Sequence, residues 1–194
     1  LSYLDKIYGE ALEPEEIVGL SIGTRPDCLP PETMDLLKKY NLRKPVFLEL
    51  GFQTCHEETA SFIRRGYHRS VFEDSVFRAK EAGLNVVIHI ILGLPGETKE
   101  MMLETIQYLN TLPIDGIKMS MLHVLKYTDL ADYYINTGFH VFEQEEYIDL
   151  VVDCLECLRK DIVVHRMTGD GPKEILIAPL WSLKKFVVLN EIDK

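Results

Sequence analysis

Three ionisable side chains interrupt apolar segments of the chain. They are Glu49 within residues 46–50, His89 within 85–92 and Lys118 within 116–122. An ionised carboxylate in such a segment is costly unless it is paired or serves a site. If the segments are neighbouring strands, the three side chains fall on matching positions, and Lys118 with Glu49 could serve an aldolase- or hydrolase-like barrel. Each one singly is better explained as a structural polar group, whereas the three together favour a site.

A further cation, Arg25, lies in the sequence GTRPD, directly after the apolar segment 17–23. The carboxyl ends of strands collect binding and catalytic residues in α/β proteins. Arg25 is therefore a candidate for the substrate side of a site. An ion pair with Asp27 or with a neighbouring helix is an equally good explanation of this residue.

The stretch HIILGLPGET, residues 89–98, is a glycine-rich turn of the kind that often holds a phosphate between a strand and a helix. It lacks the Lys-Ser/Thr ending of a Walker loop and the Gly-x-Gly-x-x-Gly of a dinucleotide loop. Pro95 removes one backbone donor, and Glu97 brings negative charge to the start of the helix. A turn in which Thr98 caps the next helix is the simpler interpretation.

The four cysteines do not form the dense set of a disulfide scaffold, which indicates free thiols in a reducing compartment. Cys154 and Cys157 have Cys-x-x-Cys spacing. They lie inside an expected helix with no second Cys or His pair, so a metal site is disfavoured. Cys28 and Cys55 follow strand ends, but nothing near them suggests a catalytic partner. The sequence predicts no metal ligands.

Apolar strand-like segments alternate with amphipathic segments along the whole chain. This order is typical of a parallel sheet covered by helices, and no linker divides it. The predicted strands are residues 17–23, 46–50, 85–92, 116–122 and 162–165, and the predicted helices are residues 56–65, 70–82 (capped by Ser70), 99–110, 129–136, 144–160 and 180–190, with another beginning near Pro31.

Side-chain parity favours a barrel over an open sheet. One face of the first four predicted strands carries small or polar residues, and the other face carries large apolar ones, as expected for a lumen and a helix-covered surface. The lumen set is Ser21, Gly23, Glu49, Gly51, His89, Ile91, Gly93, Lys118 and Ser120. The fold class predicted is α/β, a partial TIM barrel over residues 1–160 with a short C-terminal extension over residues 161–194.

Composition excludes several function classes. A formal net charge of −10 argues against a nucleic-acid surface, because phosphate binding depends on clustered Lys and Arg. No apolar run reaches the roughly 20 residues of a membrane helix. No secretion signal is visible either, so we expect a cytoplasmic protein.

Read together, five stretches and a C-terminal segment resemble the radical S-adenosylmethionine (SAM) superfamily, in the branch shared with the Elongator catalytic subunit and the YhcC-type bacterial proteins. They are GTRPD (23–27), ELGFQT (49–54), RRGYHR (64–69), EAGLNVVIHIILGLPGET (81–98), DGIKMSMLHVLKYTDL (115–130) and HRMTGDGPKEILIAPLWSLKK (165–185).

The resemblance implies SAM bound across the strand ends, a [4Fe-4S] cluster, and reductive cleavage of SAM to a 5′-deoxyadenosyl radical with electrons from a flavodoxin or ferredoxin. It assigns Ile91, Gly93 and Leu94, with His89, to the strand against the adenine. Glu49 and Gln53 fall near the ribose and substrate, and Arg25 and Lys118 toward the substrate.

The cluster-binding Cys-x-x-x-Cys-x-x-Cys of the family does not occur in the chain. The resemblance therefore implies a C-terminal portion that lacks the cluster ligands and is inactive alone. A barrel cut after its second strand would expose an edge that invites pairing with another chain. The alternatives are a non-catalytic binding or scaffold module, such as one for RNA, and a SAM-independent barrel enzyme.

Overall fold

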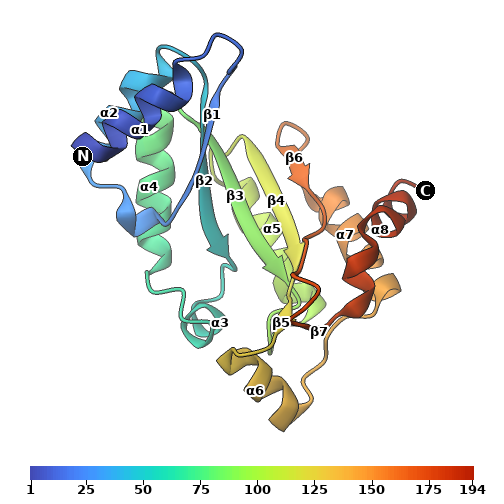
Figure 1. The fold of residues 1–194 in the computed structure, drawn as a ribbon. Helices are drawn as coiled ribbons and strands as arrows, with labels where there is room; N and C mark the ends of the chain where they lie inside the picture. The colour runs from blue at the N-terminus through green and yellow to red at the C-terminus, as the bar shows by residue number, and fades with distance from the viewer.

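The computed structural model describes all 194 residues and contains one five-stranded parallel sheet. Its order is β1 (Leu20–Thr24), β2 (Val46–Gln53), β3 (Asn85–Leu92), β4 (Gly116–Met121) and β6 (Val163–Arg166). Every neighbouring pair is parallel. The strands therefore end at a common edge, with α6 beyond it (Figure 1).

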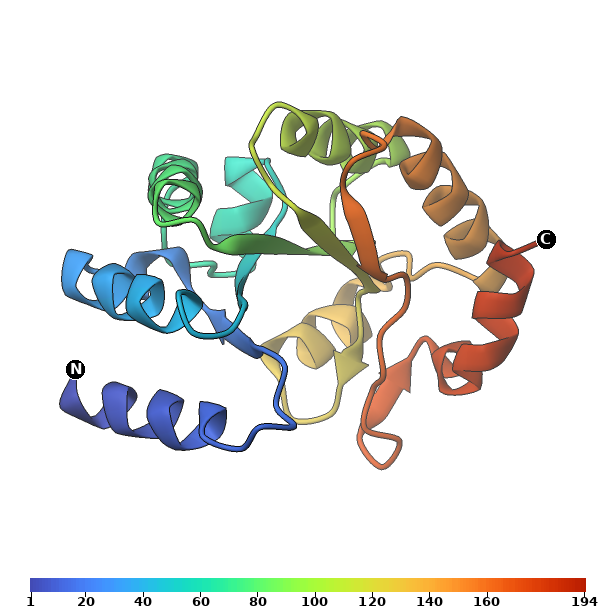
Figure 2. The ribbon, with the colours of Figure 1, turned by 90° about the horizontal axis from the view of Figure 1, so that it is seen from above.

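The crossover helices lie outside the sheet. The helices are α1 (Ser2–Leu12), α2 (Pro31–Asn41), α3 (Glu57–Phe62), α4 (Arg69–Glu81), α5 (Lys99–Asn110), α6 (Asp129–Thr137), α7 (Gln144–Cys157) and α8 (Lys185–Ile192), with 3-10 turns at Pro26–Cys28 and Leu180–Lys184. Seen along the strands, the sheet curves and α2, α4, α5 and α7 follow its outer side (Figure 2). This arrangement confirms the predicted partial barrel of βα units.

Strand β2 shows how the sequence selects the two faces. Its side chains alternate between buried and half-buried over the full length of the strand, starting with buried Val46 and ending with Gln53. Leu48, Leu50 and Phe52 have no exposed surface and pack against the helices, each contributing roughly 1.5–3 kcal/mol by burial. Glu49 therefore lies on the opposite, concave face, as parity predicts.

Two predicted helix boundaries are wrong. The helix expected over residues 56–65 ends at Phe62, because Arg64 takes a left-handed backbone with φ of 56°. The next helix begins at Arg69 rather than after a capping Ser70. The first amide of this helix, Arg69 N, donates to Glu57 Oε1 at 2.9 Å. A carboxylate from another helix therefore satisfies an amide that a capping residue would otherwise satisfy.

The C-terminal region also departs from expectation. The predicted helix over residues 144–160 ends at Cys157, and the one over 180–190 is a 3-10 turn followed by α8. A small antiparallel pair, β5 (Val124–Leu125) with β7 (Leu176–Ala178), was not predicted. Strand β6 lies beyond the predicted boundary at residue 160 and nevertheless pairs with β4.

The sheet ends on one side at β1 and on the other at β6. Pairing of an edge with another chain remains a prediction. None of the helices has the length and hydrophobicity of a membrane span.

Candidate functional site

The concave face of the sheet carries a hydrogen-bonded ionic cluster, here called the lumen cluster, of Ser21, Glu49, His89 and Lys118. Lys118 Nζ lies 2.5 Å and His89 Nε2 2.6 Å from Glu49 Oε2. The hydroxyl of Ser21 donates to the other carboxylate oxygen, Oε1. The predicted cluster of Glu49, His89 and Lys118, from β2, β3 and β4, is thus formed. The structure adds Ser21 from β1 to it.

Partial burial and mutual contact set the protonation states of this cluster. Burial raises the pKa of Glu49, but hydrogen bonds from Lys118, Ser21 and His89 outweigh it and bring the pKa from the usual 4.5 down to about 2. Burial lowers the pKa of His89 below its usual value, although Glu49 partly opposes this. At neutral pH Glu49 is therefore a carboxylate and His89 a largely neutral imidazole.

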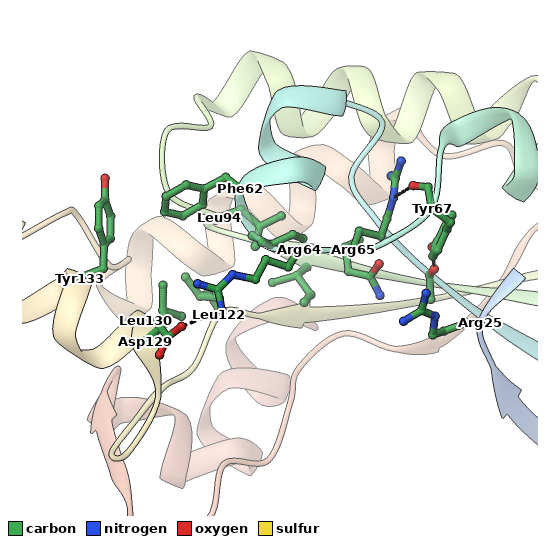
Figure 3. Close-up of a pocket in the computed structure, with 14 residues that line it drawn as sticks. Arg25, Phe62, Arg64, Arg65, Tyr67, Leu94, Leu122, Asp129, Leu130 and Tyr133 are labelled. Carbon is green, nitrogen blue, oxygen red and sulfur yellow. Dashed lines mark hydrogen bonds and ion pairs between the residues drawn. The ribbon is translucent and has the colours of Figure 1, made fainter. Parts of the chain in front are cut away.

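A cavity of about 550 Å³ opens at the carboxyl ends of the strands, one layer beyond the lumen cluster. Gly51 and Ile91, which line it, lie two residues after Glu49 and His89 on the same strand faces. The lining of this strand-end cavity is Arg25, Gly51, Gln53, Phe62, Ile63, Arg64, Arg65, Tyr67, Ile91, Leu94, Leu122, Asp129, Leu130 and Tyr133 (Figure 3).

The structure divides the residues predicted from the sequence into two adjoining groups. Arg25, Gln53, Ile91 and Leu94 line the strand-end cavity, whereas Glu49, His89 and Lys118 form the lumen cluster below it. Gly93 does neither. Its φ is 86°, and a Cβ at this position would lie 3.1 Å from the ring of Phe142. Gly93 thus serves a tight turn packed against that ring.

The sequence offered two interpretations of Arg25, a place beside the site and an ion pair with Asp27, and the structure shows both. Its guanidinium pairs with Asp27 at 2.7 Å, and it also lies 5.9 Å from the ring centre of Tyr67 at the cavity wall. Tyr67 donates its hydroxyl to the carbonyl of Gly51, and burial raises the pKa of Tyr67 to about 12. The phenol is therefore a neutral wall of the cavity.

Sequence reasoning missed the outer wall, which comes from the end of α3 with the loop that follows it and from α6. Phe62 packs edge-on against Tyr133 at 5.1 Å, and Arg64 pairs with Asp129 at 2.7 Å, so both contacts join the two segments at the cavity (Figure 3). The only sequence signal was the place of Arg64 in RRGYHR and of Asp129 near the end of the stretch 115–130, whereas Phe62 and Tyr133 lie outside the quoted stretches. Side-chain direction there depends on the left-handed backbone of Arg64.

The turn at residues 93–98 does not form a phosphate cradle. Thr98 caps α5 by accepting a hydrogen bond from Met101 N at 3.4 Å, as predicted. Glu97 turns inward, where Thr54 donates to it at 2.5 Å. Burial raises the pKa of Glu97. The loop joins β3 to α5 and places Leu94 in the cavity wall.

These features define a class of protein, namely a partial βα barrel with a ligand cavity at the carboxyl ends of its strands and a polar lumen. Residues 2–109 match the radical SAM superfamily, and residues 114–194 match the radical SAM C-terminal domain. The chain belongs to the radical SAM superfamily.

Similar proteins agree with this assignment. The chain is 41% identical over 187 residues to YtqA of Bacillus subtilis, covering 96% of the chain and 58% of YtqA. It is 33% identical over 192 residues to YhcC of Escherichia coli, covering 98% of the chain and 62% of YhcC. The chain therefore spans about three fifths of the length of these relatives.

Among solved structures, the archaeal Elp3 of Methanocaldococcus infernus with an N-terminal deletion has the same fold. The TM-score is 0.79 at 19% sequence identity, over 99% of this chain and 49% of that one. This likeness confirms the partial barrel. It extends to the helices and the C-terminal region, since nearly every residue of the chain is covered.

The family's cofactors are SAM and a [4Fe-4S] cluster, and the chain's residues fit only the first. The cavity volume of about 550 Å³ falls within the range of about 300–1,000 Å³ common for small-molecule pockets. Apolar walls with a few polar groups suit an adenosine. No group of three His, Cys, Asp or Glu side chains is placed to hold a metal, so a cluster would need ligands that are not among these 194 residues.

Proposed function

We infer that the strand-end cavity binds SAM and that the whole protein uses it in radical chemistry. The observation that carries this proposal is the cavity itself, which opens at the carboxyl ends of β2 and β3 within residues that match the superfamily. In this superfamily SAM supplies a hydrogen-abstracting 5′-deoxyadenosyl radical. The residues of this chain would bind and orient SAM.

Two side chains give the cavity an apolar surface for an adenine ring. Ile91 comes from the end of β3 and Leu94 from the turn that follows it. Gln53 ends β2 with φ of 66° after a break in the register, and its amide can both donate to and accept from a ribose. The adenine would pack against the two apolar side chains, and the ribose would hydrogen-bond to the amide of Gln53.

Direct binding tests this proposal without requiring turnover. Isothermal titration of the protein with SAM should give saturable binding. Ile91→Trp would project a larger ring into the part of the cavity assigned to the adenine and weaken binding at least tenfold. Ile135→Trp is the matched control, because Ile135 is 71% exposed on α6 and does not line the cavity. The proposal fails if the unaltered chain does not bind SAM, or if Ile91→Trp binds it as tightly while remaining folded by circular dichroism.

A SAM-independent enzyme using Lys118 as a Schiff-base amine is less well supported. A nucleophilic lysine needs a free amine, usually obtained by desolvation or by a neighbouring cation. Lys118 Nζ is instead held in an ion pair with Glu49 at 2.5 Å and is not free to attack a carbonyl. A non-catalytic module for RNA finds no support in the charge of −10.

A further inference from the structure

The concave face of the sheet carries a cation that the lumen cluster does not use. Arg166 ends β6 and lies in register with Lys118 of β4, at a point where the pairing shifts by one residue. It is also close enough to His89 for its charge to disfavour protonation of that imidazole. Arg166 is exposed and has no side-chain ion pair. A free guanidinium therefore borders the lumen cluster.

The charges on this face do not balance. Glu49 is the cluster's one carboxylate, and its two oxygens already accept from Lys118, His89 and Ser21. Two permanent cations, Lys118 and Arg166, thus share one anion at neutral pH. This local excess of positive charge occurs in a chain whose net charge is −10. The overall composition does not account for this local excess, because the chain has ten more acidic than basic residues and yet Arg166 has no acidic partner.

Two aromatic rings lie beside Arg166, on the side away from the strand-end cavity. His165, the residue before Arg166, packs its ring edge-on against Phe47 of β2 with centroids 6.3 Å apart. His165 also approaches Gly116, where an added Cβ would lie 2.5 Å from its Nε2. The two rings therefore occupy this end of the concave face. A group entering from the strand-end cavity would meet the lumen cluster and Arg166 before it reached these rings.

We propose that Arg166, with Lys118 beside it, binds an oxyanion of the substrate, a carboxylate or phosphate group, on the concave face below the SAM cavity. A guanidinium presents a planar pair of donors that matches two oxygens of either group, and a second cation strengthens the contact. This inference rests on the proposed function, because it describes the substrate of that same site. The proposal therefore predicts that the substrate carries a negatively charged carboxylate or phosphate group, although the net charge of the protein is itself negative.

The probes are inorganic phosphate and acetate, each titrated into the full chain at pH 7 and constant ionic strength. Binding is followed by calorimetry and by the nitrogen resonances of the His89 ring. We expect saturable binding of at least one anion together with a shift of the His89 resonances. Tighter binding of phosphate assigns a phosphate group and tighter binding of acetate a carboxylate. Failure of both anions to bind overturns the proposal.

Arg166→Gln should weaken anion binding at least tenfold, and its exposed position makes misfolding an improbable cause. Arg43→Gln is the matched control, because Arg43 is also exposed but lies in the turn before β2, away from the carboxyl ends of the strands. Equal anion binding by both variants would overturn the proposal. SAM affinity should stay within threefold in Arg166→Gln, whereas Ile91→Trp should lose SAM and keep the anion. The two proposals can therefore fail separately.

Discussion

Glu49 holds the lumen cluster together, so Glu49→Gln should destabilise the fold in a pH-dependent way. The fall in pKa from 4.5 to about 2 corresponds to at most about 3 kcal/mol. The side chain of Glu49 is 14% exposed and that of His89 is 35% exposed, so solvent reaches the cluster and screens it. We therefore expect Glu49→Gln to lower the free energy of unfolding by about 1–2 kcal/mol at pH 7.

The sign of the pH dependence follows from the depressed pKa. The native state keeps Glu49 ionised to lower pH than the unfolded state does, so the stabilisation is complete above about pH 5 and is lost as pH falls toward 2. The difference in stability between the unaltered chain and Glu49→Gln should shrink across that window. Urea unfolding followed by circular dichroism at pH 7, 5, 4 and 3 measures it.

Two controls make this prediction strict. Glu15→Gln removes an exposed carboxylate with no side-chain partner and should change stability by less than about 0.5 kcal/mol at every pH. A double-mutant cycle with Lys118→Met should show coupling of about 1 kcal/mol, above the additivity error of about 0.5 kcal/mol. Additive losses, or a Glu49→Gln effect that does not vary between pH 7 and 3, would refute the reasoning.

Three further changes test how the cavity walls are held. Arg65→Lys should cost about 2–4 kcal/mol in urea unfolding, because the buried Arg65 guanidinium donates to the carbonyls of Phe52, Thr54 and Tyr67 and pairs with Glu57. An effect below about 1 kcal/mol would contradict this. Thr98→Ala should cost about 1 kcal/mol by removing the cap of α5, seen as a melting temperature lower by a few degrees. Gly93→Ala should cost about 1–3 kcal/mol, more than Gly96→Ala, in the same urea assay. Both glycines have φ of 86°, but only a Cβ at Gly93 would meet Phe142, so equal losses would show that contact to be unimportant.

Local sequence pattern was sufficient to predict those features of the fold that depend on a residue and its near neighbours in the chain. The alternation along β2 predicts which side chains are buried, and the two faces of β3 and β4 follow the same rule. Thr98 caps α5 because its side chain reaches an amide three residues away. The lumen cluster could also be predicted, since parallel strands in sequential order bring matching positions together.

Prediction failed where a distant residue replaced a local partner. Ser70 was predicted to cap α4, yet Glu57 satisfies the first amide of that helix from another helix. The pair β5 and β7 joins segments about fifty residues apart, and its short strands carry no period of their own. In both cases the competing contact is formed only once the chain has folded.

Sequence alone determined the order of βα units, the faces of the strands and the three ionisable residues of the lumen cluster, because period and parity are properties of adjacent residues. The tertiary structure decided which side chains enclose the strand-end cavity, since α6 and the loop at Arg64 meet only after the sheet has formed. It also decided that Arg166 shares a face with Lys118. A shift of one residue in strand pairing changes the face a side chain occupies, and no local pattern encodes that shift.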